Sequence, residues 1–220
     1  MIIAIDGPAG SGKSTIARLL AKQLDILYID TGAMYRALTL KAMQSGIDLK
    51  DEDALIDLAK NTHLKLTSGA SGKIKVFIDG KDVSEEIRTP HLTNNVSYVA
   101  NIEGVRRQMV RLQRSTGIGA KNGAVLEGRD IGTVVFPDAN KKFYLDANIK
   151  ERSRRRYKEL LKKHGIKTNL TELQKDIKIR DKKDKTRKAG ALKKADDAIF
   201  INTTNLTIKQ VLKKIISCLK

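Results

Sequence analysis

With 220 residues, the chain is long enough to form one well-filled α/β domain. Aromatic residues make up only 4% of the sequence and tryptophan is absent, which argues against a base-stacking platform for single-stranded nucleic acid. No apolar run approaches the ~18 residues of a membrane helix, and the N-terminus lacks a signal-peptide pattern. Because Cys218 is the single cysteine, no intrachain disulfide is possible, and we expect a cytoplasmic protein without a membrane partner.

The net charge of +18 is concentrated in one part of the chain. Residues 141–195 hold 21 of the 43 lysines and arginines but only 7 of the 25 acidic residues. A stretch this basic indicates either a nucleic-acid partner or a site for highly anionic small molecules.

Short apolar runs alternate with helical patterns along the chain, which predicts a mainly parallel sheet flanked by helices. Buried strands are predicted at residues 1–5, 26–29, 124–126, 143–145 and 198–201, and the first helix at Lys13. Residues 63–83 break the pattern. Residues 64–66 and 74–78 resemble antiparallel strands joined by a turn at residues 68–72, which predicts a small insert on the core.

The segment Gly7–Ser14 matches the pattern G-x-x-x-x-G-K-[ST]. Its glycines let backbone N–H groups surround phosphate oxygens, and the following helix adds its positive N-terminal end. Lys13 reaches the β- and γ-phosphates, and the Ser14 hydroxyl is a ligand for Mg²⁺. Because a buried strand ends at Gly7 and a helix begins at Lys13, the context favours a P-loop NTPase fold over a structural turn. The predicted donor-binding residues are Gly7, Pro8, Ala9, Gly10, Ser11, Gly12, Lys13, Ser14 and Thr15.

Glu127 directly follows the apolar run at residues 124–126. In phosphate-loop enzymes, a carboxylate at a strand end holds the hydration shell of Mg²⁺, usually as aspartate. Glu127 is therefore a candidate metal residue beside Ser14, acting through water. The alternative is a solvated acid at the end of a strand.

Arg152, Arg155 and Arg156 are spaced i, i+3 and i+4, so they share one face of a predicted helix. Three guanidinium groups on one face repel each other unless an anion lies among them. A triphosphate undergoing phosphoryl transfer supplies such distributed charge. These arginines are therefore candidate catalytic cations.

A second helical stripe begins apolar and becomes charged, with spacings of 4, 3, 4 and 3. Its apolar end is expected to pack inward, so its charged end points toward the interior or a cleft. There an acid accepts from sugar hydroxyls while arginines hold phosphates. The alternative is a salt-bridged solvent face. The stripe consists of Leu173, Ile177, Arg180, Asp184 and Arg187.

Two further segments, Asp30–Arg36 and Gly128–Gly132, each follow a predicted strand. They are expected at the carboxyl edge of the sheet, where open α/β sheets bind ligands. Each offers an arginine near small residues and a hydroxyl or carboxylate, which suits a phosphate and a polar ring.

Taken together, these motifs resemble the bacterial-type cytidylate kinases, the (d)CMP kinases of the nucleoside monophosphate kinase group. The resemblance runs nearly end to end and includes the small β insert. It implies one P-loop kinase domain over residues 1–220, with an acceptor-binding insert at about 60–100 and a short helical lid at about 150–168. The matching stretches are GPAGSGKST at 7–15, DTGAMYRA at 30–37, VSEEIRT at 83–89, EGRDIGTVVFPDA at 127–139, KFYLDA at 142–147 and RDKKDKTR at 180–187.

The resemblance also implies ATP as the phosphoryl donor, Mg²⁺ as the cofactor and CMP or dCMP as the acceptor, in a monomer without a nucleic-acid partner. The residues that would hold the acceptor phosphate are Thr31, Arg36, Arg129 and Arg187. The cytosine ring would be read by Ser97, Arg106 and Asp130. The sugar would be bound by Arg180 and Asp184. The implied catalytic cations are Lys13, Arg129, Arg187 and, on the lid, Arg152, Arg155 and Arg156.

The chain departs from the family pattern in three places. Gly190-Ala191-Leu192 stands where members commonly have Ala-Pro-Leu, Glu127 replaces a frequent aspartate, and Asn202 replaces a common aspartate. None of these changes is expected to abolish activity. Two alternatives stay open: a kinase for another nucleotide or shikimate, and a nucleotide-dependent protein that binds nucleic acid through its basic surface.

Overall fold

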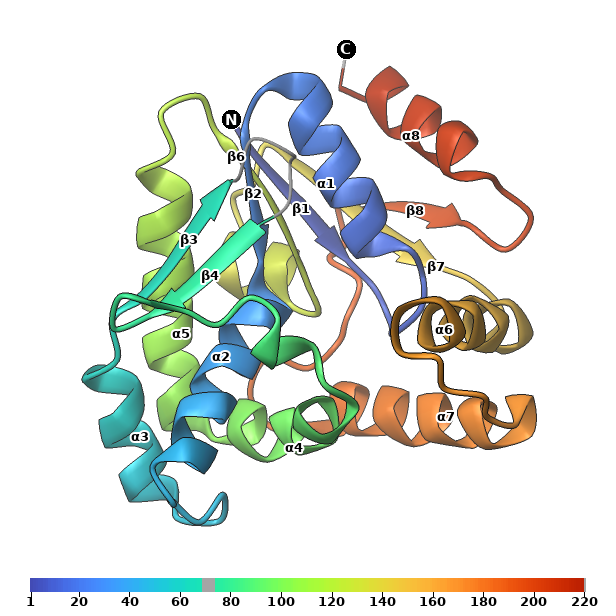
Figure 1. Ribbon diagram of the computed structural model, residues 1–220. Helices are drawn as coiled ribbons and strands as arrows, with labels where there is room; N and C mark the ends of the chain where they lie inside the picture. Colours follow the sequence, from blue (N-terminus) through green and yellow to red (C-terminus); the bar gives the residue numbers. More distant parts are fainter. Residues whose placement is uncertain (69–73, 220) are drawn as a thin grey trace.

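A fully parallel five-stranded sheet forms the centre of the protein (Figure 1). The computed structural model describes residues 1–68 and 74–219. Across the sheet the strands are β2 (Leu27–Asp30), β6 (Ala124–Gly128), β1 (Ile2–Asp6), β7 (Lys141–Asp146) and β8 (Ile199–Asn202). In the central strand β1, every residue from Ile3 to Asp6 is buried, as expected for a parallel strand covered on both faces.

The predicted strands are confirmed, with small shifts at their ends. β6 extends two residues beyond the predicted run because Glu127 and Gly128 continue the ladder opposite Ile5 and Asp6 of β1. On the other side of β6, Glu127 is opposite Asp30 of β2. The carboxyl ends of β1, β2 and β6 therefore lie side by side, so the segments that follow them meet at one edge of the sheet.

Helices flank this sheet, which confirms the predicted P-loop α/β fold. α1 (Lys13–Leu24) begins at the predicted residue and packs beside α8 (Ile208–Ser217). α2 (Thr31–Gln44) and α5 (Glu103–Ile118) both pack against β6. The Asp30 carboxylate starts α2 by accepting from the Ala33 N–H at 2.7 Å.

The predicted insert contains a separate antiparallel sheet of β3 (Leu64–Ser68), β4 (Ile74–Ile78) and β5 (Lys81–Asp82). The predicted turn at residues 68–72 falls largely outside the described residues. β4 alternates buried Ile74, Val76 and Ile78 with outward-facing residues, so one face of this small sheet packs on α2 and β2. The remaining elements around this sheet are α3 (Glu52–Lys60), the 3₁₀ turn η1 (Glu86–Arg88) and α4 (Pro90–Asn101).

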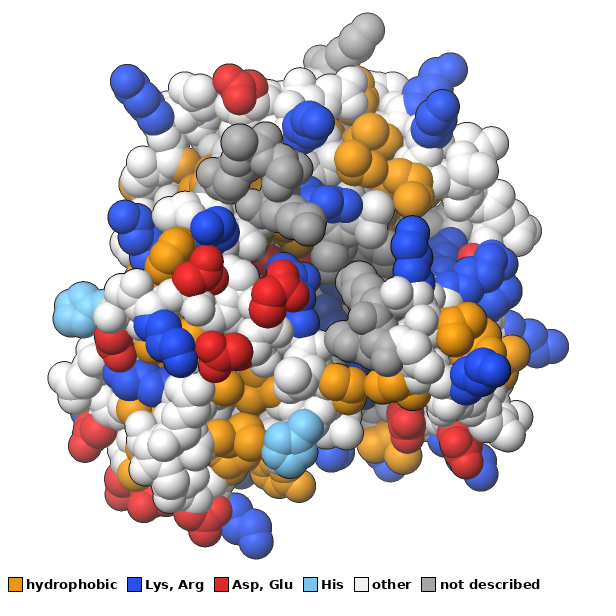
Figure 2. All heavy atoms as spheres, viewed as in Figure 1, with side chains coloured by type: hydrophobic (Ala, Val, Ile, Leu, Met, Phe, Trp, Pro, Cys, Tyr) orange, Lys and Arg blue, Asp and Glu red, His pale blue; other side chains and the backbone are white. Residues whose placement is uncertain are grey.

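Two long helices pack together beside the phosphate loop, α6 (Ile149–His164) and α7 (Leu170–Thr186) (Figure 1). The range predicted for the lid coincides largely with α6. Figure 2 shows basic side chains gathered over this part of the molecule and around a hollow near the middle of the face. A short π-helical turn, η2 (Ile131–Val135), follows β6. No helix in the described part of the chain is long and apolar enough to cross a membrane.

Candidate active site

The phosphate loop connects the end of β1 with the start of α1. Gly7 has a φ of +147°, and a Cβ at this position would lie 2.0 Å from the backbone oxygen of Leu145 in β7. Gly12 has a φ of +97° and forms the N-cap of α1. Only glycine permits this combination of left-handed backbone and close approach, so the loop takes the shape that its sequence predicts.

Lys13 is the first residue of α1, and its side chain is buried within the loop. Its Nζ donates to the backbone oxygen of Pro8 at 2.9 Å. Burial lowers the pKa of Lys13 to about 7, and the positive charge of Arg129 acts in the same direction. Glu127 and Asp6 oppose this shift. The carboxylates near Lys13 therefore compensate its positive charge only in part.

Ser14 and Glu127, the two predicted metal residues, are in direct contact. The Ser14 hydroxyl donates to Oε1 of Glu127 at 2.6 Å, and Glu127 is only 5% exposed. Burial, together with the nearby Asp30, raises the pKa of the Glu127 carboxyl. The alternative of a solvated strand-end acid is therefore wrong. An exposed hydroxyl in contact with a buried carboxylate, beside a phosphate loop, offers oxygen donors that fit Mg²⁺, which takes its other ligands from water and phosphate.

Five charged side chains from three segments form one cluster beside the phosphate loop. Nε of Arg129 donates to Asp184 Oδ2 at 2.7 Å. Asp130 pairs with Arg106 from α5 and lies 3.7 Å from Arg187. Burial alone would raise the pKa of the Asp184 carboxyl. The positive charges of Arg129 and Arg180 have the larger combined effect and hold this pKa below its usual value. Arginines and aspartates thus alternate through the cluster.

The helical stripe on α7 faces inward, so the alternative of a salt-bridged solvent face is wrong. Leu173 and Ile177 are buried, and the side chains of Asp184 and Arg187 are only 18% and 7% exposed. Arg180 is half-buried and has no hydrogen bond or ion pair with any residue that the structure describes. Burial lowers the pKa of Arg180 to about 10, and Arg129 adds to this shift.

The predicted residues of α2, α4 and α5 border the same cluster. The Thr31 hydroxyl donates to the backbone oxygen of Glu127 at 2.7 Å, and Arg36 pairs with Asp30 at 3.3 Å. The guanidinium of Arg106 lies 5.4 Å from the ring centre of Tyr35, as in a cation–π contact. The side-chain hydroxyl of the half-buried Ser97, on α4, makes no hydrogen bond within the described part of the chain.

The three predicted arginines of α6 separate into two groups. Nη1 of Arg152 donates to the backbone oxygen of Ala9 at 3.1 Å and pairs with Asp181 of α7 at 2.6 Å. Nη1 of Arg155 donates to the backbone oxygen of Ser11 at 3.3 Å. Both side chains therefore touch the phosphate loop.

Arg156 differs, because it pairs with Glu159 on its own helix at 2.9 Å and is half-exposed. Each of the three arginines thus has a different carboxylate partner, since Arg155 pairs with Glu151, which it shares with Arg154. The sequence pattern placed the three on one face but did not indicate these partners.

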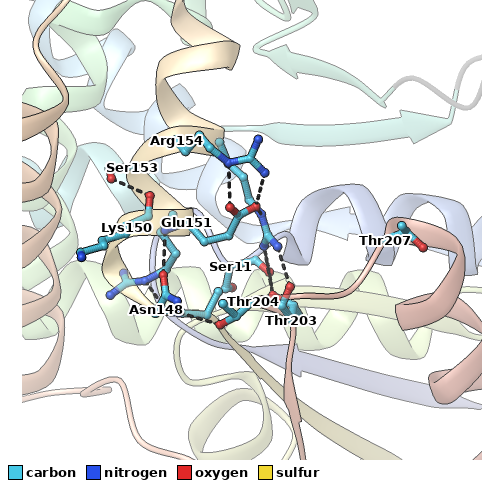
Figure 3. A network of polar contacts seen from close by, with 12 residues as sticks. Ser11, Asn148, Lys150, Glu151, Ser153, Arg154, Thr203, Thr204 and Thr207 are labelled. Atoms are coloured by element: carbon cyan, nitrogen blue, oxygen red, sulfur yellow. Dashed lines mark hydrogen bonds and ion pairs between the residues drawn. The ribbon is translucent and has the colours of Figure 1, made fainter.

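Sequence reasoning missed two buried residues of the site. Thr203, after β8, donates from its hydroxyl to the Ser11 backbone oxygen at 3.0 Å and accepts from Arg155 at the same distance. Figure 3 shows Thr203 beside Ser11, with Glu151 and Arg154 of α6 close by. Asp6 bridges β1 and the segment after β6 through two backbone hydrogen bonds. Neither residue belongs to a recognisable motif, because the partners of both are distant in the sequence: 48 and 192 positions for Thr203, and 125 and 126 positions for Asp6.

A phosphate loop with a buried lysine, an adjoining serine–glutamate pair and an arginine-rich cluster beside the loop define a phosphate-loop kinase. The fold resembles that of a gluconokinase from Sinorhizobium meliloti, with a TM-score of 0.50 over 99% of this chain and 90% of that one. At 11% sequence identity, this likeness concerns the fold alone.

The sequence itself gives the family. Residues 3–220 match the family model described as cytidylate kinase. The cytidylate kinase of Bacillus pumilus is 51% identical, with 97% of this chain and 93% of the relative covered. That of Clostridioides difficile is 49% identical, with 99% and 97% covered. The chain belongs to the cytidylate kinase family and is thus a nucleoside monophosphate kinase.

Proposed function

We propose that the protein transfers the γ-phosphoryl group of ATP to CMP or dCMP, giving ADP and CDP or dCDP. The observation that carries this proposal is the cluster of alternating arginines and aspartates beside the phosphate loop, in a chain of this family. Such a cluster suits an acceptor that combines a phosphate with polar groups.

The donor binds in the loop Gly7–Thr15, where Lys13 meets the β- and γ-phosphates. The Lys13 ammonium takes a phosphate oxygen in place of the Pro8 carbonyl that it now contacts. Ser14 would hold Mg²⁺, with Glu127 acting through water, a role that their contact supports. When bound, the ion would supply positive charge that offsets the negative charge of the phosphates.

The acceptor phosphate is held by Thr31, Arg36, Arg129 and Arg187. These arginines now pair with Asp30, Asp184 and Asp130, which shows that their side chains already reach carboxylate anions in this region. A phosphate carries more charge than a carboxylate and accepts bidentate hydrogen bonds from guanidinium groups. It therefore competes well for the same donors.

Ser97, Arg106 and Asp130 read the cytosine ring, and Arg180 with Asp184 binds the sugar. Arg106 and Asp130 offer a buried donor and acceptor, which uracil would leave mismatched at the 4-position. The half-buried Arg180 has no ion-pair partner among the described residues, so its N–H groups are available to bind the acceptor nucleotide. The prediction is a preference for cytosine over uracil.

Transfer proceeds in line. The bond between the γ-phosphorus and the bridging oxygen breaks, its electron pair stays on ADP, and an acceptor phosphate oxygen forms the new bond. Because that oxygen is already anionic, no strong general base is needed. Lys13, Arg129 and Arg187 offset the charge that develops, while Arg152, Arg155 and Arg156 on the lid helix enclose the triphosphate.

The test is an assay of ADP release with CMP, dCMP, UMP, AMP and shikimate as acceptors. We expect CMP and dCMP to give the highest kcat/KM, with UMP lower by at least about 10-fold because one hydrogen-bonding pair is mismatched. AMP or shikimate as the best acceptor would refute the assignment. Steeply salt-dependent binding of RNA or DNA, in place of turnover, would favour the nucleic-acid alternative.

A further inference from the structure

Asp6 joins two parts of the site that bind different substrates. It is the last residue of β1, directly before Gly7 of the phosphate loop, and it is 5% exposed. One carboxylate oxygen accepts from the Ile131 N–H at 2.9 Å, and the other accepts from the Gly132 N–H at 2.7 Å. The two segments are separated by more than 120 positions in the sequence.

The segment that Asp6 holds is continuous with the acceptor cluster. Ile131 and Gly132 begin η2 and directly follow Arg129 and Asp130, which carry the ion pairs to Asp184 and Arg106. A shift of the backbone at residues 131–132 would therefore move the acceptor cluster relative to the phosphate loop. The two-point hydrogen bond of Asp6 opposes such a shift.

The burial of this carboxylate works against its ionised form. Burial raises the pKa of Asp6 to about 6, although both N–H groups favour the charged carboxylate. The nearby charges act in opposite directions, since Asp130 raises the pKa of Asp6 and Lys13 lowers it. An apolar side chain would avoid the cost of burying a charge, but it would leave the two buried N–H groups without an acceptor and the two segments without this link.

We infer that Asp6 is a positioning residue that fixes the acceptor segment, residues 129–132, at the distance from the phosphate loop that in-line transfer requires. The inference rests on the proposed function, since it assumes that the two substrates bind on either side of this contact. Asp6 touches neither substrate in this role. Its contribution is to the geometry of the ternary complex, where a displacement of about 1 Å costs on the order of 100-fold in rate.

The experiment compares Asp6→Asn and Asp6→Glu with the native enzyme. Asparagine presents an N–H₂ group to one of the two backbone N–H donors, and glutamate keeps the charge but lengthens the arm by one methylene. Asp51→Asn is the control for a lost backbone hydrogen bond, because the exposed Asp51 also accepts from a backbone N–H, that of Ala54, but at the N-cap of α3. Dissociation constants for ATP and CMP are measured separately by calorimetry, and kcat is measured well below the thermal midpoint of each variant.

We expect kcat to fall by about 100-fold in both Asp6 variants, while each nucleotide alone binds within about threefold of native affinity. The Asp51 control should be native in both respects. A merely structural role would lower the thermal midpoint and leave kcat of the folded enzyme unchanged, so kcat within about threefold of native in either folded variant would overturn the inference. If the native enzyme does not phosphorylate CMP, the proposed function fails instead, and the comparison is made with the monophosphate that it does phosphorylate.

Discussion

Replacing Gly190 with alanine tests the acceptor cluster directly. Gly190 has a φ of +62°, and a Cβ there would lie 2.2 Å from Oδ2 of Asp130 and 2.3 Å from Nη2 of Arg106. The left-handed backbone costs an alanine about 1–2 kcal/mol. The contact adds a second cost, because the methyl group occupies the space of a buried ion pair whose side chains are 4% and 7% exposed.

The size of the second cost depends on how far the pair separates. Leaving a buried charge without its partner costs about 3–5 kcal/mol, and partial separation costs less. We therefore expect Gly190→Ala to lower the free energy of unfolding by about 2–5 kcal/mol in total. Because Arg106 and Asp130 are proposed to read the base, KM for CMP should rise by about 10-fold or more, while KM for ATP stays unchanged.

Gly46→Ala is the matched control. Gly46 has a φ of +67°, but no atom lies within 4 Å of its Cβ position, so only the backbone cost applies. Urea denaturation gives the free energy of unfolding of both variants, and the ADP-release assay gives the two KM values. Equal losses of stability in the two variants, together with a native KM for CMP, would refute the reasoning.

A double variant, Gly190→Ala with Ala191→Pro, would test whether glycine is needed at position 190 because no proline follows it. Proline restricts the residue before it to extended conformations, which differ from the φ of +62° at Gly190. Ala-Pro is also the pair that resembling sequences commonly carry at this place. We expect the added proline to move residue 190 away from the ion pair, so the double variant should lose less activity with CMP than the single one.

Two further predictions concern the lysine and the arginine whose charges lack full compensation. Since the pKa of Lys13 is lowered to about 7 and a bound polyphosphate raises it again, ATP binding should take up close to one proton at pH 8 and almost none at pH 6. Calorimetry in buffers of different ionisation enthalpy measures this uptake. It should vanish in Lys13→Ala, which should also lose turnover by orders of magnitude with the fold intact, and equal uptake in that variant would contradict the assignment. Arg180→Leu should raise the free energy of unfolding by about 1 kcal/mol, because it removes a half-buried cation without an ion-pair partner among the described residues, yet raise KM for CMP. Reduced stability with an unchanged KM for CMP would count against a role of Arg180 in the acceptor site.

The sequence predicts best the features whose cause is local. The phosphate loop follows from glycine spacing and the strand–helix context, and the inward stripe of α7 follows from its apolar start at Leu173 and Ile177. The burial of Glu127 could also be anticipated in part, since it continues an apolar strand.

Contacts between distant segments could not be predicted in this way. Asp6 reads as the residue that ends a strand, and nothing local indicates that its carboxylate binds the backbone of residues 131–132. Thr203 reads as one of several threonines in a loop. For the arginines of α6, spacing indicates a shared face but not that Arg156 finds its own acid, Glu159, one turn along the helix.

The ion pairs of the acceptor cluster also bear on how this basic protein selects among anions. With a net charge of +18, a pocket of unpaired arginines would collect any small anion in its surroundings. Asp130 and Asp184 instead occupy those guanidinium groups and hold them in defined rotamers. An incoming anion must compete with a carboxylate already in place, so weakly held monoanions are excluded. The rotamer entropy of the arginines is also lost when the chain folds, not when the nucleotide binds.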